Sequence, residues 1–485
     1  MHLTRRHILT LLLVSTAPAA WADVRPPKKE KLLPPANLNQ ILRQYKPSGT
    51  HSIVVADAVT GRILEASSGD KSLPPASVAK ALTTIYALQN LGSNWQFKTR
   101  VVASGSQVIG GILQGDLTLQ GGGDPALDTD GLADLLAQLQ ARGITGISGK
   151  FGVYAGALPY QRVLDRDQQE YVGYNPSISG LNLNFNRVFL EWKRGETGYD
   201  FALSAKSKSF KPAVGSVSIR AVNRTEPVYK YSSVGGRDSW TVSSQALGSK
   251  GNRWLPVRNP ADYAGEVFVQ LAADMGIKLP AHRMLKSPQQ GAIMAQAESA
   301  PLSAICRSML KYSTNLTAET VGLSASLKRG VRIAKVSDSA GSMSDWVKAR
   351  FRLRDLRLVD HSGLGDNSKV SAKEMVKVLG SVGWNGPLRS LMKPIRLRNA
   401  EWKKAPIEGV DVMAKTGTLN FTSALAGYLT AASGQRLVFA IFTVDQRARA
   451  SIPKAKRDRA PGARGWSRQS RIFQHQLLAR WGRVY

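Results

Sequence analysis

The segment Pro74–Leu91, PPASVAKALTTIYALQNL, combines a turn signal with an apolar helix pattern. The two prolines disfavour helix before them, so the helix is expected to begin close to Ser77. Apolar residues then recur at helical spacing as far as Leu91, which predicts a packed helix over about Ser77–Leu91. Ser77 therefore stands at a helix N-terminus, where backbone N–H groups are free, and Lys80 shares its face of the helix.

A serine and a lysine one helical turn apart can form a nucleophile and its base. The pattern S-x-x-K is weak alone, because common residues produce it by chance. It occurs five times here, starting at Ser68, Ser77, Ser308, Ser390 and Ser451. A lysine acts as a base only where partial burial removes its proton. Only Ser77 and Lys80 open a strongly apolar helix, so they are the candidate catalytic pair.

Two further short motifs occur once each. Ser313-Thr314-Asn315 is the only S-x-N, and Lys415-Thr416-Gly417 is the only K-T-G. Alone, Ser313-Thr314-Asn315 is more typical of a polar helix end than of a catalytic site. Lys415-Thr416-Gly417 alone is equally typical of a solvated strand edge and of a binding site. A lysine and a hydroxyl on an edge strand, with a glycine that permits close backbone approach, also suit an extended peptide with a carboxylate. Thr418 continues this strand.

In this order the three motifs resemble the signature of penicillin-binding proteins and serine β-lactamases. More specifically, the chain resembles the D-alanyl-D-alanine carboxypeptidase/endopeptidases of low-molecular-mass class C, the penicillin-binding protein 4 type of peptidase family S13. Three further stretches resemble motifs of that family: GGGDP at 121–125, SGLNLN at 179–184 and DHSGL at 360–364. The resemblance covers nearly all of the chain beyond the N-terminal segment.

The resemblance implies a role for each motif residue. Ser77 would attack the carbonyl of a D-Ala-D-Ala or D-Ala–diamino-acid bond, with Lys80 as general base. Ser313 would relay a proton to the leaving amine, and Asn315 would hold Lys80 and the substrate amide. The substrate-binding residues would be Lys415, Thr416, Gly417 and Thr418. Backbone N–H groups of Ser77 and Thr418 would form the oxyanion hole.

The implied substrate is a peptidoglycan stem peptide, and β-lactam antibiotics would be covalent inhibitors. No metal or organic cofactor is expected. Two alternatives stay open. A serine β-lactamase shares the motifs but has little reason to carry a large insertion, and a non-catalytic peptidoglycan-binding scaffold would keep the fold and lose the serine–lysine pair. Asp360, His361 and Ser362 are adjacent in a glycine-flanked turn, so a structural loop is expected there rather than a catalytic triad.

The expected fold is an α/β (α+β) body of the penicillin-binding and serine β-lactamase type, an antiparallel sheet flanked by helices. Short strand-like runs dominate residues 98–260, which predicts a large, mainly β insertion forming one or two extra domains. The predicted division is a signal peptide at 1–22, a linker at 23–36, a catalytic domain at 37–97 and 261–485, inserted domain II at 98–145 and 222–260, and nested domain III at 146–221.

The first 22 residues have the pattern of an export signal. Arg5 and Arg6 precede a short apolar run, Ile8–Val14, and Ala20 and Ala22 flank a cleavage point. The apolar run is too short to span a bilayer. The double arginine also resembles a twin-arginine signal, although the export route stays open. The expected location is the periplasm.

Composition excludes several classes of protein. The single cysteine, Cys306, rules out an intrachain disulfide, and the scattered histidines rule against a zinc hydrolase. The formal net charge is +32, which in an exported protein indicates contact with anionic membrane or wall polymers rather than nucleic acid. Within Arg447–Arg483, Asp458 is the only acidic residue. This stretch is either such a binding surface or simply a solvated basic surface.

Overall fold

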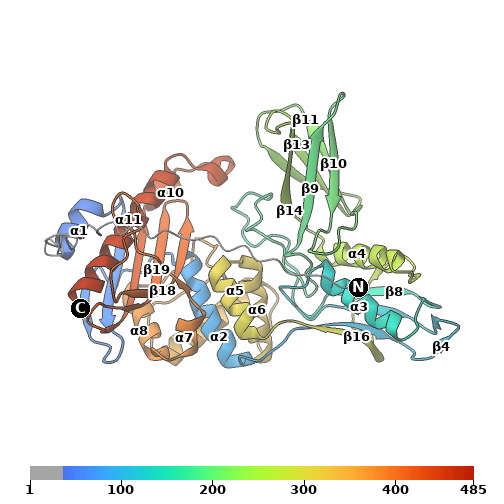
Figure 1. Ribbon diagram of the computed structural model, residues 1–485, viewed down its shortest axis with the longest axis horizontal. Helices are drawn as coiled ribbons and strands as arrows, with labels where there is room; N and C mark the ends of the chain where they lie inside the picture. The colour runs from blue at the N-terminus through green and yellow to red at the C-terminus, as the bar shows by residue number, and fades with distance from the viewer. Residues whose placement is uncertain (1–36) are drawn as a thin grey trace, which may run out of the picture.

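The computed structural model describes residues 37–485, and Figure 1 shows a helix-and-sheet body beside a large inserted part. The predicted signal peptide and linker, residues 1–22 and 23–36, lie outside the described residues. Among residues 37–485, no helix has the length and apolarity needed to cross a membrane.

The centre of the body is an antiparallel sheet with strand order β17-β18-β19-β20-β1-β2. Both ends of the chain build it. Its strands are β1 (Thr50–Asp57), β2 (Ile63–Ser67), β17 (Lys393–Pro394), β18 (Asp411–Leu419), β19 (Thr422–Thr430) and β20 (Arg436–Val444). The interior strands β19 and β20 are buried over almost their whole length, because helices cover both faces of the sheet.

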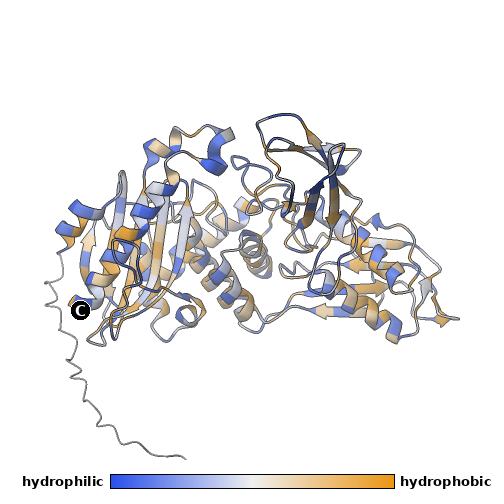
Figure 2. Cartoon of the chain, turned by 45° about the horizontal axis from the view of Figure 1, so that its top comes forward, coloured by the Kyte–Doolittle hydropathy of each residue, from blue (hydrophilic) through white to orange (hydrophobic). Residues whose placement is uncertain are grey.

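Side-chain alternation along the strands supplies two separate cores. Along β20, Val438 and Ala440 face one core, whereas Leu437 and Phe439 face the other. The first core is covered by α2 (Ala79–Leu91), α5 (Leu302–Tyr312), α6 (Asn315–Lys328), α7 (Val336–Phe351), α8 (Ala372–Val382) and α9 (Pro387–Leu391). The second is covered by α1 (Leu38–Tyr45) and α11 (Ala463–Val484). Figure 2 shows hydrophobic residues recurring along these strands and their covering helices.

Between β20 and α11 the chain forms α10 (Gln446–Ala450) and η2 (Lys454–Arg459). In Figure 1 this connection projects from the body towards the inserted part. It is therefore placed to contact the insertion.

The insertion begins with a five-stranded sheet of order β15-β8-β6-β3-β16. Its elements are β3 (Lys98–Ala103), β6 (Leu117–Gln120), β8 (Phe151–Tyr154), β15 (Arg283–Met284), β16 (Ala292–Glu298), α3 (Thr129–Ala141) and α4 (Pro260–Asp274). A small sheet beside it contains β4 (Val108–Ile109), β5 (Ile112–Leu113) and β7 (Gly146–Ile147). The helices α3 and α4 contribute to the same hydrophobic core as β3, β6 and β8.

Two three-stranded sheets stand together above this layer (Figure 1). One has the order β10-β9-β14, with β9 (Arg187–Arg194), β10 (Tyr199–Ser204) and β14 (Lys250–Pro256). The other has the order β11-β13-β12, with β11 (Val217–Val222), β12 (Tyr229–Val234) and β13 (Arg237–Ser243). The predicted α/β (α+β) body with a large, mainly β insertion is confirmed.

The internal boundaries differ from those that the sequence predicted. Strand β16 pairs with β3, and α4 packs in the inserted core, so the body resumes at α5 and not at residue 261. Strands β9 and β11 pair with β14 and β13 across the predicted division at 221 and 222. The reason is that local patterns identify a helix or a strand, whereas its partner lies far along the chain.

The Trp481 side chain packs helix α11 against the body sheet. Truncating this side chain tests the packing. Trp481 is fully buried, lies 5.8 Å from Phe439 between ring centroids, and donates Nε1–H to Glu65 at 2.9 Å. We expect Trp481→Ala to lower the free energy of unfolding by about 3–5 kcal/mol. The unfolding temperature measured by calorimetry should fall by several degrees. The matched change Arg483→Ala, at an exposed position of the same helix, should have little effect. Equal transitions for wild type and Trp481→Ala would contradict this packing.

Candidate active site

Ser77 lies in a tight turn rather than in the first turn of the α-helix. Residues Ala76–Val78 form a single 3-10 turn, η1, and α2 proper begins at Ala79. Ala76 has a φ of 45°, a conformation that side-chain-bearing residues rarely adopt. Such strain persists only where the surroundings impose it, and it concentrates at functional sites. The turn therefore holds the Ser77 backbone in a defined position at the front of α2.

Lys80 lies directly behind Ser77 and is fully buried. Its Nζ contacts Ser77 Oγ at 3.0 Å, Asn315 Oδ1 at 2.7 Å and the Ser362 carbonyl oxygen at 2.7 Å. Burial lowers the pKa of Lys80 to about 8, although the nearby carboxylates of Asp360 and Glu319 act in the opposite direction. Lys80 can therefore lose its proton near neutral pH.

A second buried lysine reaches a second serine in the same region. Lys415 Nζ donates to Ser313 Oγ at 2.9 Å and to the Thr416 carbonyl oxygen at 2.6 Å. Burial holds the pKa of Lys415 well below its usual range, and the charges of Lys80 and Lys393 lower it further. Ser313 ends α5 in the left-handed conformation, with a φ of 62°. This sharp turn brings Ser313 and the start of α6, where Asn315 lies, towards Ser77.

The K-T-G sequence lies on β18, and its glycine allows the strand to touch the turn before α2. A Cβ atom at Gly417 would lie 2.9 Å from both the Ser77 nitrogen and the Pro75 carbonyl oxygen. Any larger residue would push β18 away from Ser77. The next residue, Thr418, lines the same pocket as Ser77. Close backbone approach at Gly417 therefore brings Ser77 and Thr418 to one site.

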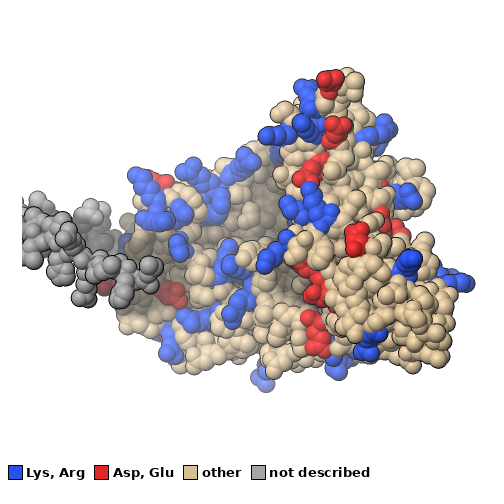
Figure 3. Space-filling model, turned by 45° about the vertical axis from the view of Figure 1, so that its right-hand side comes forward, with Lys and Arg blue, Asp and Glu red and all other residues tan. Residues whose placement is uncertain are grey.

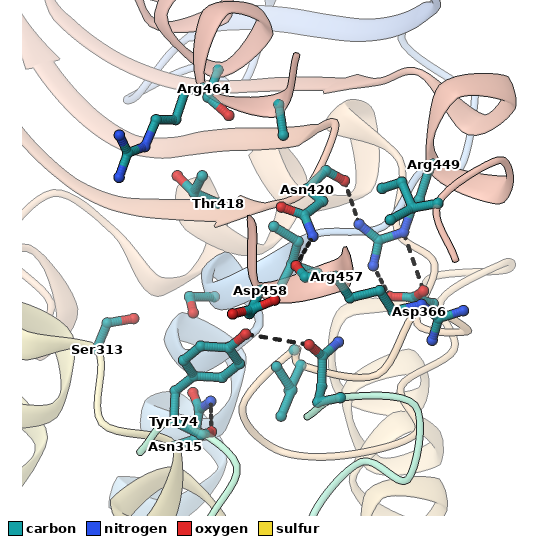
Figure 4. A pocket seen from close by; sticks show the side chains of 18 of the residues that line it. Tyr174, Ser313, Asn315, Asp366, Thr418, Asn420, Arg449, Arg457, Asp458 and Arg464 are labelled. Carbon is teal, nitrogen blue, oxygen red and sulfur yellow. Dashed lines mark hydrogen bonds and ion pairs between the residues drawn. The ribbon is translucent and has the colours of Figure 1, made fainter. Parts of the chain in front are cut away.

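One pocket of about 720 Å³ contains the predicted residues Ser77, Ser313, Asn315 and Thr418 in its lining (Figure 4). The amine groups of Lys80 and Lys415 reach Ser77 and Ser313 from positions that are almost fully buried. Thr416 and Gly417 belong to the adjoining strand. The structure thus brings together all of the residues that the three motifs singled out.

The insertion also reaches this pocket, which the sequence did not indicate. The segment 165–175, here named the strap, connects β8 to β9 and extends over Asn315. The Tyr174 carbonyl oxygen accepts a hydrogen bond from Asn315 Nδ2 at 2.7 Å, across 141 residues of sequence. Tyr174 and Gln168 both line the pocket. Nothing in the sequence around Tyr174 marks it, because the contact uses only its backbone.

The strap is joined to η2 by hydrogen bonds. Tyr171 donates its hydroxyl hydrogen to the Asp458 carboxylate, and Gln169 Nε2 donates to the Lys454 carbonyl oxygen at 2.6 Å. Arg457 Nη1 donates to the Asp167 carbonyl oxygen at 2.9 Å. The strap and η2 therefore form one continuous rim of the pocket.

The D-H-S-G-L segment is a supporting loop. Asp360 accepts hydrogen bonds from the N–H groups of Gly363 at 2.5 Å and Gly365 at 2.6 Å. The ring of His361 contacts Ser339 Oγ at 2.8 Å, and burial lowers its pKa to about 3, so it is neutral. No Ser–His–Asp triad forms among these residues. As predicted, the loop is structural. Its Ser362 carbonyl oxygen accepts a hydrogen bond from the Lys80 amine.

Known proteins resemble the chain along most of its length. The profile of the D-Ala-D-Ala carboxypeptidase 3 (S13) family matches residues 35–463. The D-alanyl-D-alanine carboxypeptidase DacB of Haemophilus influenzae is 26% identical over 431 residues, covering 84% of this chain and 88% of that protein. A D-alanyl-D-alanine carboxypeptidase of an Actinomadura species is 26% identical over 480 residues, covering 90% and 84%.

The crystal structure of penicillin binding protein 4 from Haemophilus influenzae superposes with a TM-score of 0.72 at 21% identity, covering 91% of this chain and 99% of that one. The fold is thus that of a penicillin-binding protein with inserted domains. The chain belongs to the D-Ala-D-Ala carboxypeptidase 3 (S13) family, a family of hydrolases, so it is an enzyme. The resemblance seen in the three motifs is confirmed.

The protonation of Lys80 can be measured directly. We expect its signal in NMR spectra of carbon-labelled lysine, assigned by its loss in Lys80→Met, to titrate near the pKa of about 8, below the ~10.4 of an ordinary lysine. In Glu319→Gln the titration should shift lower still, since that carboxylate favours the charged amine. Unfolding temperatures of both variants serve as the control for folding. Titration above about pH 10 would show a permanently charged amine.

Proposed function

We propose that this enzyme is a serine-type D-Ala-D-Ala carboxypeptidase that cleaves peptidoglycan stem peptides through an acyl-enzyme on Ser77. The observation that carries this proposal is the contact of the buried Lys80 amine with Ser77 Oγ at 3.0 Å, in a pocket open to a peptide. The names of the relatives, D-alanyl-D-alanine carboxypeptidases, support the same substrate class.

The contacts of Lys80 allow it to act as a base once it has lost a proton. Asn315 Oδ1 and the Ser362 carbonyl are acceptors, so they take two N–H hydrogens of the amine. Ser77 Oγ is the only one of the three contacts that can itself donate a hydrogen. When Lys80 is neutral, its lone pair is therefore directed at the Ser77 hydroxyl. This geometry prepares the proton transfer that nucleophilic attack requires.

In the proposed reaction, Ser77 Oγ forms a bond to the substrate carbonyl carbon as its proton passes to Lys80. The Ser77 and Thr418 N–H groups would stabilise the negative oxygen, since η1 and β18 meet at this point. The C–N bond then breaks, and the leaving amine takes a proton through Ser313. Water releases the acyl group in a second step and restores the Ser77 hydroxyl.

The substrate's terminal carboxylate would bind at Lys415 and Thr416. In the empty site, burial and the neighbouring lysines disfavour a charge on Lys415. An arriving carboxylate supplies the opposite charge and raises the pKa of Lys415 again. Carboxylate binding and protonation of Lys415 are therefore coupled.

Endopeptidase cleavage of a D-Ala–diamino-acid bond would use the same acylation by Ser77, amine release through Ser313 and hydrolysis by water.

Penicillin should remain attached for a long time. The two carboxylates that line the pocket already have partners, since Asp366 pairs with Arg449 and Asp458 accepts the Tyr171 hydroxyl. Among the described lining residues, neither acid is therefore free to activate water quickly. A solved structure of the Haemophilus influenzae relative contains a bound β-lactam.

We also propose that the enzyme acts in the periplasm, because residues 1–22 have the sequence pattern of an export signal.

Covalent labelling with a fluorescent penicillin tests the nucleophile. We expect the wild type to form an adduct that persists for minutes, and Ser77→Ala to form none, because the reacting oxygen is gone. The matched control is Ser308→Ala, which removes the serine of another S-x-x-K pattern, outside the pocket, and should label normally. An unlabelled but folded wild type would favour a non-catalytic scaffold, and rapid turnover of the drug would favour a β-lactamase.

The pH dependence of acylation tests the base. Because burial lowers the pKa of Lys80 to about 8, the neutral amine is the minor form below that pH. The labelling rate should rise about tenfold per pH unit towards pH 8 and level off above it. A rate that stays constant from pH 6 to pH 9 would mean that Lys80 does not take the proton in the rate-limiting step.

A further inference from the structure

One wall of the catalytic pocket carries arginine side chains that form no ion pair with a carboxylate of residues 37–485. Arg464, Arg468 and Arg471 are exposed residues of α11, spaced so that they share one helix face. All three line the same pocket as Ser77. Figure 4 shows Arg464 near Thr418, apart from Arg449 and Asp366. Figure 3 shows Lys and Arg side chains around the hollow between the body and the inserted domains.

The acidic groups of the pocket do not neutralise these arginines. Asp366 pairs with Arg449, and Asp458 accepts the Tyr171 hydroxyl. Across residues 37–485, no ion pair joins a carboxylate to any of the three α11 arginines. Arg471 already donates Nε–H to the Ser467 carbonyl oxygen at 3.2 Å and lies over the Trp402 ring. Arg464 and Arg468 make no such contact within residues 37–485, so their guanidinium groups are available for an anionic ligand. The first turn of α11, which begins at Ala463, adds the positive end of the helix dipole.

We infer that Arg464 and Arg468 form a second carboxylate subsite, with the charge of Arg471 beside them, which binds an acidic group of the peptide substrate away from the scissile bond. This inference rests on the proposed function and extends it to substrate selection. A planar guanidinium binds a carboxylate through two parallel hydrogen bonds, which suits recognition of one acidic residue. The subsite would favour peptides with a free internal carboxylate over peptides in which that group is amidated.

The position of the arginines selects a peptide over a membrane as their ligand. They line a concave pocket that also contains the nucleophile, and the strap and η2, which are joined by hydrogen bonds, form part of its rim. A flat lipid surface could not enter this space. An extended peptide held at Ser77 would instead run along Thr418, Leu419 and Asn420, which line the pocket on the way to α11.

The test compares two D-Ala-D-Ala peptides that differ only in an internal carboxylate or carboxamide. Wild type should prefer the carboxylate peptide by about tenfold in kcat/KM. In the double variant Arg464→Gln and Arg468→Gln, kcat/KM for that peptide should fall about tenfold, mainly through KM. Hydrolysis of the carboxamide peptide should change less than about twofold. The control Arg483→Gln, on the same helix outside the pocket, should leave both unchanged.

Several outcomes would overturn the inference. These are an equal loss for both peptides, no loss for either, or unchanged peptide kinetics with lost binding to vesicles of anionic lipid. Titration of both peptides into Ser77→Ala provides a readout that does not depend on turnover. If wild type hydrolyses neither peptide, the proposed function fails, whereas tighter binding of the carboxylate peptide that requires the arginines would still support the subsite.

Discussion

The active site depends on one constraint, the burial of the Lys80 amine. Out of water, a lysine keeps its proton poorly, and its remaining hydrogens must find acceptors. Asn315 Oδ1 and the Ser362 carbonyl provide them, and they come from two segments that lie far from α2 in sequence. The sheet, the helices of the first core and the loop after Asp360 all serve to bring these acceptors behind Ser77.

Three unusual backbone features around Lys80 position the segments of the candidate site. The positive φ of Ala76 sets the turn before Ser77, and the left-handed Ser313 ends α5 where α6 must begin. Gly417 lets β18 approach Ser77 without a side chain in the way. Backbone strain at Ala76 and Ser313 and close approach at Gly417 thus lie where the three motifs meet, and the packing around them maintains these conformations.

The insertion takes part in the site. Its strap donates no catalytic side chain, yet it engages Asn315 through a backbone carbonyl and joins η2 to close one rim of the pocket. Helix α11 presents arginines to the same pocket. The pocket is therefore shaped by both ends of the chain and by the insertion together.

Local sequence features predicted the family and the candidate site residues: an apolar helix behind Ser77, a lysine one turn on, and the S-x-N and K-T-G motifs in that order. These features are local, because helix faces, turns and strand ends depend on neighbouring residues. The sequence also indicated the mixed body and its β insertion. Three findings required the folded chain: α4 and β16 belong to the insertion, the Tyr174 carbonyl reaches Asn315, and the α11 arginines line the same pocket as Ser77. Those contacts join residues far apart in the chain, often through backbone atoms common to every residue type, so no local pattern records them.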